Sequence, residues 1–132
     1  MTAAVHTLIV DDDADAREVV QILLESEGRH VIEAADGGSA LDALASGRVF
    51  NLIILDLMWP EMDGATFLEH LSRSAHASVP VVIFSSFSFD GLERFANVIS
   101  MVPKLDGIEK LLAAIRSLDR RAPVVQNIFS TA

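Results

Sequence analysis

Short apolar runs alternate with amphipathic segments along most of the chain, and this alternation limits the possible folds more than any other feature. The apolar runs cover residues 7–10, 30–34, 52–55, 81–84 and 98–102. Apolar side chains recur at helical spacing over residues 15–27, 39–46, 64–73 and 108–118. Strands that alternate with helices in this way predict an α/β fold built on a doubly wound, five-stranded parallel sheet.

The chain length and its last segment indicate the domain organisation. The 132 residues fit one domain, and they contain no internal repeat or linker-like stretch. The segment after residue 120 contains Pro123 and lacks helical periodicity. We therefore expect one domain over residues 1–121, followed by a C-terminal tail over residues 122–132.

The charge and the cysteine count exclude several classes of function. A formal net charge of −9 repels the phosphates of nucleic acids and of anionic membranes. The chain has no cysteine, which excludes disulfides, thiolate metal sites and cysteine nucleophiles. No stretch has the pattern of a secretory signal or of a membrane span. We expect a cytoplasmic protein, a monomer or weak dimer, with no nucleic-acid or membrane partner.

Chemically active side chains directly follow four of the five predicted strands. They are Asp11, Asp12 and Asp13 after the first strand, Asp56 after the third, Ser85 and Ser86 after the fourth, and Lys104 after the fifth. The carboxyl ends of parallel strands meet at one edge of a sheet, so these side chains are expected to converge there.

The negative charge of such a cluster must be neutralised, either by raised pKa values of the carboxyl groups or by a cation. Two carboxylates ~4 Å apart repel each other by about 4 kcal/mol at an effective dielectric constant of ~20. Oxygen ligands select a hard ion such as Mg²⁺. Lys104 adds a positive charge for an anionic group, and Ser85 adds a hydroxyl donor. Together these groups predict a phosphoryl-transfer site with a carboxylate nucleophile.

Three stretches resemble the receiver domains of bacterial two-component signalling. They are residues 8–13, residues 52–64 with Asp56, Pro60 and the pair Asp63-Gly64, and residues 79–86. The resemblance extends over residues 5–118 and implies the flavodoxin-like (βα)5 receiver fold. The segment between Ser85 and Lys104 is shorter than is usual in that family, which predicts a short or irregular fourth helix.

The resemblance also implies a magnesium site. Asp12, Asp56 and the backbone carbonyl of Met58 would ligate the ion directly, and Asp11 would hold it through water. Asp13 would be peripheral.

A phosphoryl acceptor is implied at the same place. Asp56 would take the phosphoryl group from a histidine kinase or a histidine phosphotransfer protein, while Ser85 and Lys104 would contact the group after transfer. The domain would catalyse only its own phosphorylation and dephosphorylation. No output domain follows, so the signal is expected to pass to a downstream protein target by contact or by onward phosphotransfer.

The chain departs from the family pattern at several positions. Leu105 stands where a proline usually follows the lysine, and Met101 replaces the usual switch aromatic. The apolar residues Met58 and Phe87 flank the expected phosphoryl position, where they cannot orient an attacking water, so we expect slow self-dephosphorylation. Four of the seven phenylalanines cluster before Lys104, where core packing is the preferred interpretation and a surface docking patch for some of the rings is the alternative; they are Phe84, Phe87, Phe89 and Phe95.

Other interpretations remain open for the same residues. The three N-terminal aspartates could simply cap the first helix, although an EF-hand loop is excluded because Ala16 and Ile22 replace its glycine and glutamate. An aspartate-based phosphatase would need a second aspartate where Met58 stands. A degenerate receiver that binds partners independently of phosphate is the main alternative function.

Overall fold

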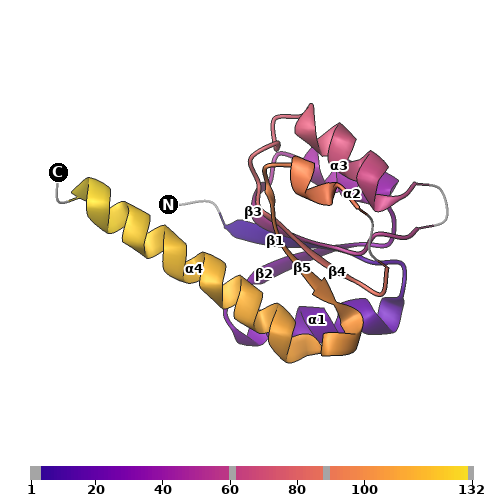
Figure 1. The fold of residues 1–132 in the computed structure, drawn as a ribbon, viewed down its shortest axis with the longest axis horizontal. Coiled ribbons are helices and arrows are strands. Elements are labelled where there is room, and N and C mark those ends of the chain that lie inside the picture. The colour runs from indigo at the N-terminus through magenta and orange to yellow at the C-terminus, as the bar shows by residue number, and fades with distance from the viewer. Residues whose placement is uncertain (1–3, 60–61, 88–89, 131–132) are drawn as a thin grey trace.

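The computed structural model describes residues 4–59, 62–87 and 90–130, and the side chains as far as residue 120. Five parallel strands form one sheet in the order β2-β1-β3-β4-β5 (Figure 1). The strands are β1 (Val5–Val10), β2 (His30–Ala34), β3 (Val49–Leu55), β4 (Val81–Ser85) and β5 (Val98–Pro103). The predicted doubly wound parallel sheet is confirmed.

Helices cover both faces of the sheet, as Figure 1 shows. Helices α2 (Gly37–Leu44) and α3 (Gly64–Ser72) pack on one face, around a cluster that includes Phe67 and Leu71. Helices α1 (Ala14–Ser26) and α4 (Ile108–Ser130) pack on the other face, around Leu24, Leu111 and Ile115. The central strands are therefore buried on both sides, which explains their continuous apolar runs.

An aspartate caps each of the first three helices at the carboxyl edge of the sheet. Asp13 accepts hydrogen bonds from the backbone N–H groups at positions 15 and 16, at 3.0 and 3.2 Å. Asp36 accepts from the backbone of Ser39 at 2.7 Å, and Asp63 accepts from the backbone of Thr66 at 2.8 Å. These hydrogen bonds lower the pKa of Asp36 and of Asp63. The caps fix where each helix leaves the edge that carries the site.

Between β4 and β5 the described residues contain only a short 3-10 helix, η1 (Leu92–Arg94), so the prediction of a short or irregular fourth helix is confirmed. The phenylalanines of this region differ in exposure. Phe84 and Phe95 are buried, whereas Phe87 is 54% exposed. Phe89 lies outside the described residues.

Helix α4 extends further than the sequence pattern predicted. The expected helix ended at residue 118, but the backbone stays helical through the expected tail as far as Ser130. Figure 1 shows the yellow C-terminal half of α4 leaving the sheet. Apolar side chains recur along a helix only where that helix packs against the rest of the protein. The apolar spacing therefore ends where α4 leaves the sheet, although the backbone remains helical. Within the described part of the chain, no helix has the length and apolar character needed to span a bilayer.

Candidate functional site

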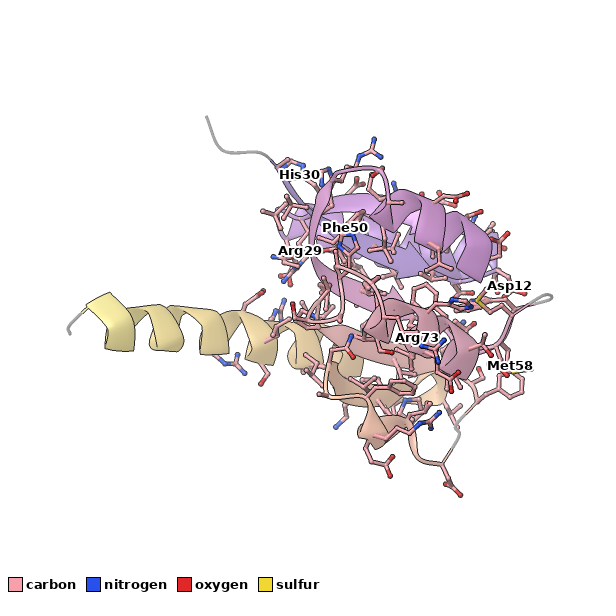
Figure 2. All side chains as sticks on the ribbon, turned by 90° about the horizontal axis from the view of Figure 1, so that it is seen from above. Asp12, Arg29, His30, Phe50, Met58 and Arg73 are labelled. Carbon is pink, nitrogen blue, oxygen red and sulfur yellow. The ribbon has the colours of Figure 1, made fainter. Side chains whose placement is uncertain are left out.

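The side chains predicted to converge lie together at the carboxyl edge of the sheet. Asp11 directly follows β1 and Asp56 directly follows β3, while Ser85 is the last residue of β4. Lys104 follows β5 and begins the 3-10 helix η2 (Lys104–Asp106). Figure 2 shows Asp12 at the same end of the molecule as Met58, which lies two residues after Asp56.

Three carboxylates form an acidic cluster, which we define as Asp11, Asp12 and Asp56. Each contributes an oxygen atom, and these oxygens lie within 4.8 Å of one another. Asp11 and Asp56 are buried, with 5% and 7% of their surface exposed, whereas Asp12 is exposed. An all-oxygen donor set that is open on one side fits a hard divalent ion that keeps some of its water ligands, as Mg²⁺ does.

Lys104 supplies the positive charge that the acidic cluster contacts. Its Nζ lies 2.7 Å from Asp11 Oδ2 and 3.2 Å from Asp56 Oδ2. Burial lowers the pKa of Lys104, but its hydrogen bonds and charge interactions with these two carboxylates outweigh burial and raise it overall. Burial also raises the pKa of Asp11, despite the hydrogen bonds from Lys104 and from the backbone of Asp13. The lysine thus reaches the cluster although Leu105, not proline, follows it.

The Ser85 hydroxyl is the centre of a buried hydrogen-bond network. It donates to Asp56 Oδ1 at 2.5 Å. It accepts from the backbone N–H groups of Leu57 at 3.3 Å and of Phe87 at 3.2 Å. The Leu57 N–H also donates to Asp56 Oδ1 at 2.7 Å. Asp56 is therefore held on one oxygen by Ser85 and Leu57, and on the other by Lys104.

Met58 and Asp13 lie at the border of the site. The Met58 side chain is 39% exposed, and its backbone pairs with that of Asp63 across the β3–α3 loop. Asp13 caps α1 through its carboxylate, so the capping interpretation applies to this aspartate and not to the acidic cluster. Its N–H donates to Asp11 Oδ1 at 2.9 Å.

Arg17 is a residue of the site that sequence reasoning missed. Its Nη1 donates to the backbone carbonyl of Asp11 at 2.7 Å, and its Nε pairs with Glu33 Oε1 at 3.3 Å. A cation in the first turns of a helix opposes the helix dipole, which is an unusual placement that could have drawn attention to it. Arg17 holds the turn that carries Asp11 and Asp12 against β2.

A small cavity lies beside Ser85 on the side of β5. Its volume is about 150 Å³, and its lining includes Ile83, Phe87 and Met101. Phe87 and Met101 are both partly exposed at this cavity. Met101 therefore lines a largely apolar space next to the hydroxyl that contacts Asp56.

Comparison with known sequences gives consistent matches. The family model described as the response regulator receiver domain matches residues 7–94. Response regulator MprA of Mycolicibacterium vanbaalenii is 36% identical over 122 residues, which cover 89% of this chain and 51% of the relative. MprA of Mycobacterium avium is 36% identical over 130 residues, covering 95% of this chain and 55% of the relative. The chain spans about half the length of these curated relatives.

Solved structures share the fold. A response regulator receiver protein from Pseudomonas putida superposes with a TM-score of 0.77 at 22% identity, covering 89% of this chain and 98% of that one. Chemotaxis protein CheY4 of Vibrio cholerae gives 0.74 at 26% identity, with 88% and 98% covered. Response regulator TrrA of Thermotoga maritima, solved in complex with Mg²⁺-BeF, gives 0.74 at 24% identity, with 86% and 97% covered.

Proposed function

The chain belongs to the response regulator receiver domain family, and from this premise we propose that Asp56 accepts a phosphoryl group in a magnesium-dependent reaction. The donor is a phosphohistidine of a histidine kinase or of a histidine phosphotransfer protein. The phosphorylated form signals by protein contact or passes the group onward.

The observation that carries this proposal is the environment of the Asp56 carboxylate. It is buried, with a neutral donor, the Ser85 hydroxyl, on Oδ1 and a charged donor, the Lys104 ammonium, on Oδ2. On its other side the carboxylate shares the acidic cluster with Asp11 and Asp12. A carboxylate that only closed a loop would not need a lysine and two further carboxylates around it.

The reaction is a displacement at phosphorus. A carboxylate oxygen of Asp56 forms a bond to the phosphorus atom, and the bond from phosphorus to the donor imidazole nitrogen breaks. The electron pair of that bond stays on the donor nitrogen, and a proton on the other ring nitrogen lets the donor leave as neutral imidazole. Bound by the acidic cluster, Mg²⁺ would neutralise the charge that the phosphoryl oxygens bring to the site.

The residues of the chain hold the acceptor and then the product. Before transfer, Leu57 N–H and the Ser85 hydroxyl fix Asp56 Oδ1. After transfer, the Ser85 hydroxyl turns to a phosphoryl oxygen, and Lys104 pairs with the new dianion because its ammonium already lies 3.2 Å from Asp56 Oδ2. The backbone N–H of Phe87, which donates to Ser85, links this change to the surface of the β4–β5 region.

The test is phosphorylation of the purified chain by a small phosphodonor such as acetyl phosphate. We expect mass spectrometry to detect one added phosphoryl group when Mg²⁺ is present and none after chelation, and Asp56→Asn should remove the addition. Trp59 fluorescence should respond to Mg²⁺ and again to beryllofluoride, and Asp56→Ala should lose the second response. Equal modification of wild type and Asp56→Asn would contradict the proposal. Failure to modify the chain, with normal partner binding by Asp56→Ala, would favour the phosphate-independent alternative.

A further inference from the structure

The single tryptophan of the chain lies in the loop that carries the proposed phosphoacceptor. Trp59 is three residues after Asp56, and only 6% of its surface is exposed. The side chains of this loop alternate in exposure, because Leu57 is fully buried and Met58 is 39% exposed. The tryptophan ring therefore points into the protein directly after the residue that the magnesium site is proposed to use.

The ring packs against the start of α2. A Cβ atom added to Gly37, the first residue of that helix, would lie 3.1 Å from Cζ3 and 3.3 Å from Cε3 of Trp59. The same Cβ would lie 2.7 Å from Sδ of Met62. Any side chain larger than glycine at position 37 would displace these groups, so the β3–α3 loop and the N-terminus of α2 are in direct contact.

Packing holds the ring in place. The ring also meets Phe67 of α3 edge-on, with ring centroids 5.6 Å apart and an interplanar angle of 86°. The indole Nε1 is buried, and no described residue accepts a hydrogen bond from it. The position of Trp59 therefore depends on ring shape and volume between α2 and α3.

The loop is also fixed at its beginning. The backbone carbonyl of Leu57 accepts from Gly64 N–H at 2.8 Å, and a Cβ on Gly64 would lie 2.5 Å from Leu57 Cδ2. Leu57 and Trp59 are thus both anchored, and Met58, whose carbonyl is a proposed magnesium ligand, lies between the two anchors. The Met58 backbone also pairs with that of Asp63, so the tryptophan ring is one of two contacts next to Met58 that can set the place of its carbonyl.

We propose that Trp59 is a positioning residue for the magnesium site: its ring, held between Gly37 and Phe67, sets the place of the Met58 carbonyl relative to the acidic cluster. This inference deepens the proposed function and rests on it for the identity of the ion. Residues that orient metal ligands typically change metal affinity by about 10–100-fold when replaced.

The first test compares Trp59→Ala with Trp59→Phe in the full chain, with the dissociation constant for Mg²⁺ measured by isothermal titration calorimetry. We expect about tenfold weaker binding in Trp59→Ala, because the loop loses its outer anchor. Trp59→Phe should stay within about threefold of wild type, because the ring contacts remain and Nε1 has no partner among the described residues to lose. Wild-type affinity in Trp59→Ala would overturn the proposal.

The second test keeps Trp59 in the sequence and displaces its ring by adding a side chain to a neighbouring residue. Gly37→Ala should weaken magnesium binding about tenfold. Gly38→Ala is the matched control, because the same gain in helix propensity occurs one residue later, where the added Cβ meets only an Asp36 oxygen at 3.5 Å. In a Trp59→Leu background, Gly37→Ala should weaken magnesium binding less than it does in wild type, because the added Cβ then meets Met62 Sδ, at 2.7 Å, but no longer the indole ring. Equal effects of Gly37→Ala in both backgrounds would overturn the proposal.

A variant that lowers stability at a distant place in the protein shows whether Trp59 acts on the magnesium site or only on the stability of the fold. Ile115→Ala removes a buried side chain of α4 from the core cluster on the other face of the sheet. It should lower the thermal unfolding midpoint and leave the magnesium dissociation constant unchanged. If Ile115→Ala weakens magnesium binding as much as Trp59→Ala, general loss of stability explains both, and the proposal is wrong. These tests measure magnesium binding and use no phosphodonor. They can therefore be interpreted even if Asp56 is not phosphorylated in the test of the proposed function.

Discussion

The two ends of the parallel sheet both carry ionic groups, but these groups differ in burial and in how their charges are balanced. At the carboxyl end, the three carboxylates of the acidic cluster face Lys104. At the amino end, Arg29 pairs with Asp119 at 2.5 Å, and its other contacts are the neutral side chains of Thr7 and Asn51. Figure 2 shows Arg29, with His30 and Phe50, well away from Asp12 and Met58.

This difference separates a functional cluster from a stabilising one. One arginine and one aspartate neutralise each other, so the amino end has no need of a further ion. One lysine cannot neutralise three carboxylates, so the remaining negative charge must be offset by protonation of a carboxyl group or by another cation, and the proposed function supplies Mg²⁺ as that cation. Stability at the carboxyl end should therefore depend on magnesium, while stability at the amino end should not.

The largest effect is expected at Lys104. Lys104→Met leaves the carboxylates of Asp11 and Asp56 without their cation, which should lower the free energy of unfolding by about 3 kcal/mol in the absence of divalent ions. Added Mg²⁺ should restore part of the loss, because it supplies the missing positive charge. Urea unfolding with and without Mg²⁺ measures both values. Lys110→Met, at an exposed position of α4, is the control. A loss that Mg²⁺ does not reduce would contradict the charge argument.

Next in size is the amino end. Arg29→Met removes the partner of the buried Thr7 hydroxyl and of Asp119, and should lower the free energy of unfolding by about 1–2 kcal/mol. The same urea series should give this loss equally with and without Mg²⁺. Arg48→Met, at an exposed position, should have little effect. If the Arg29→Met loss varied with Mg²⁺, the two ends would not be independent and the contrast between them would fail.

The acidic cluster was predictable because it depends on topology alone. Once the apolar runs are taken as parallel strands, Asp11, Asp56 and Ser85 must meet at one edge, whatever their packing. The contacts of Trp59 were not predictable in the same way. Its burial depends on a glycine 22 positions earlier in the chain, and no periodicity links the two residues. Phe87 was equally undetermined, because one cluster of phenylalanines contains both buried and exposed rings.

A third prediction concerns Asp12, where a substitution should raise the free energy of unfolding instead of lowering it. Asp12→Asn removes one negative charge from the exposed side of the acidic cluster, and so reduces its repulsion with Asp11 and Asp56. Without divalent ions this should raise the free energy of unfolding by about 1 kcal/mol, since exposure screens much of the repulsion. The stabilisation that Mg²⁺ gives to wild type should shrink. Asp15→Asn, at an exposed position of α1, is the matched control. A loss of stability in Asp12→Asn would contradict the argument.

The sequence pattern also did not predict the direct pairing of Lys104 with Asp11. The family resemblance implied that this lysine would meet a phosphoryl group, whereas in the structure its ammonium already lies against two carboxylates. Leu105 stands where the family usually has a proline after the lysine, and the ammonium still reaches both carboxylates. Side-chain length compensates for such backbone differences, because a four-carbon stem can reach the same anion from several backbone positions.

The smallest effect is expected at the exposed pair of the amino end. Arg116 donates to both Glu27 oxygens, at 3.2 and 2.9 Å, and this contact lowers the pKa of Glu27. A carboxyl group whose pKa is lowered by folding adds stability above its unfolded pKa, and loses it as the pH falls through the lowered value. Arg116→Gln should therefore raise the pKa of Glu27 towards its ordinary value, as measured by NMR titration of the side-chain carboxyl. Its unfolding at neutral pH should change little, because water and salt screen an exposed pair. An unchanged Glu27 titration would mean that the pair does not persist in solution.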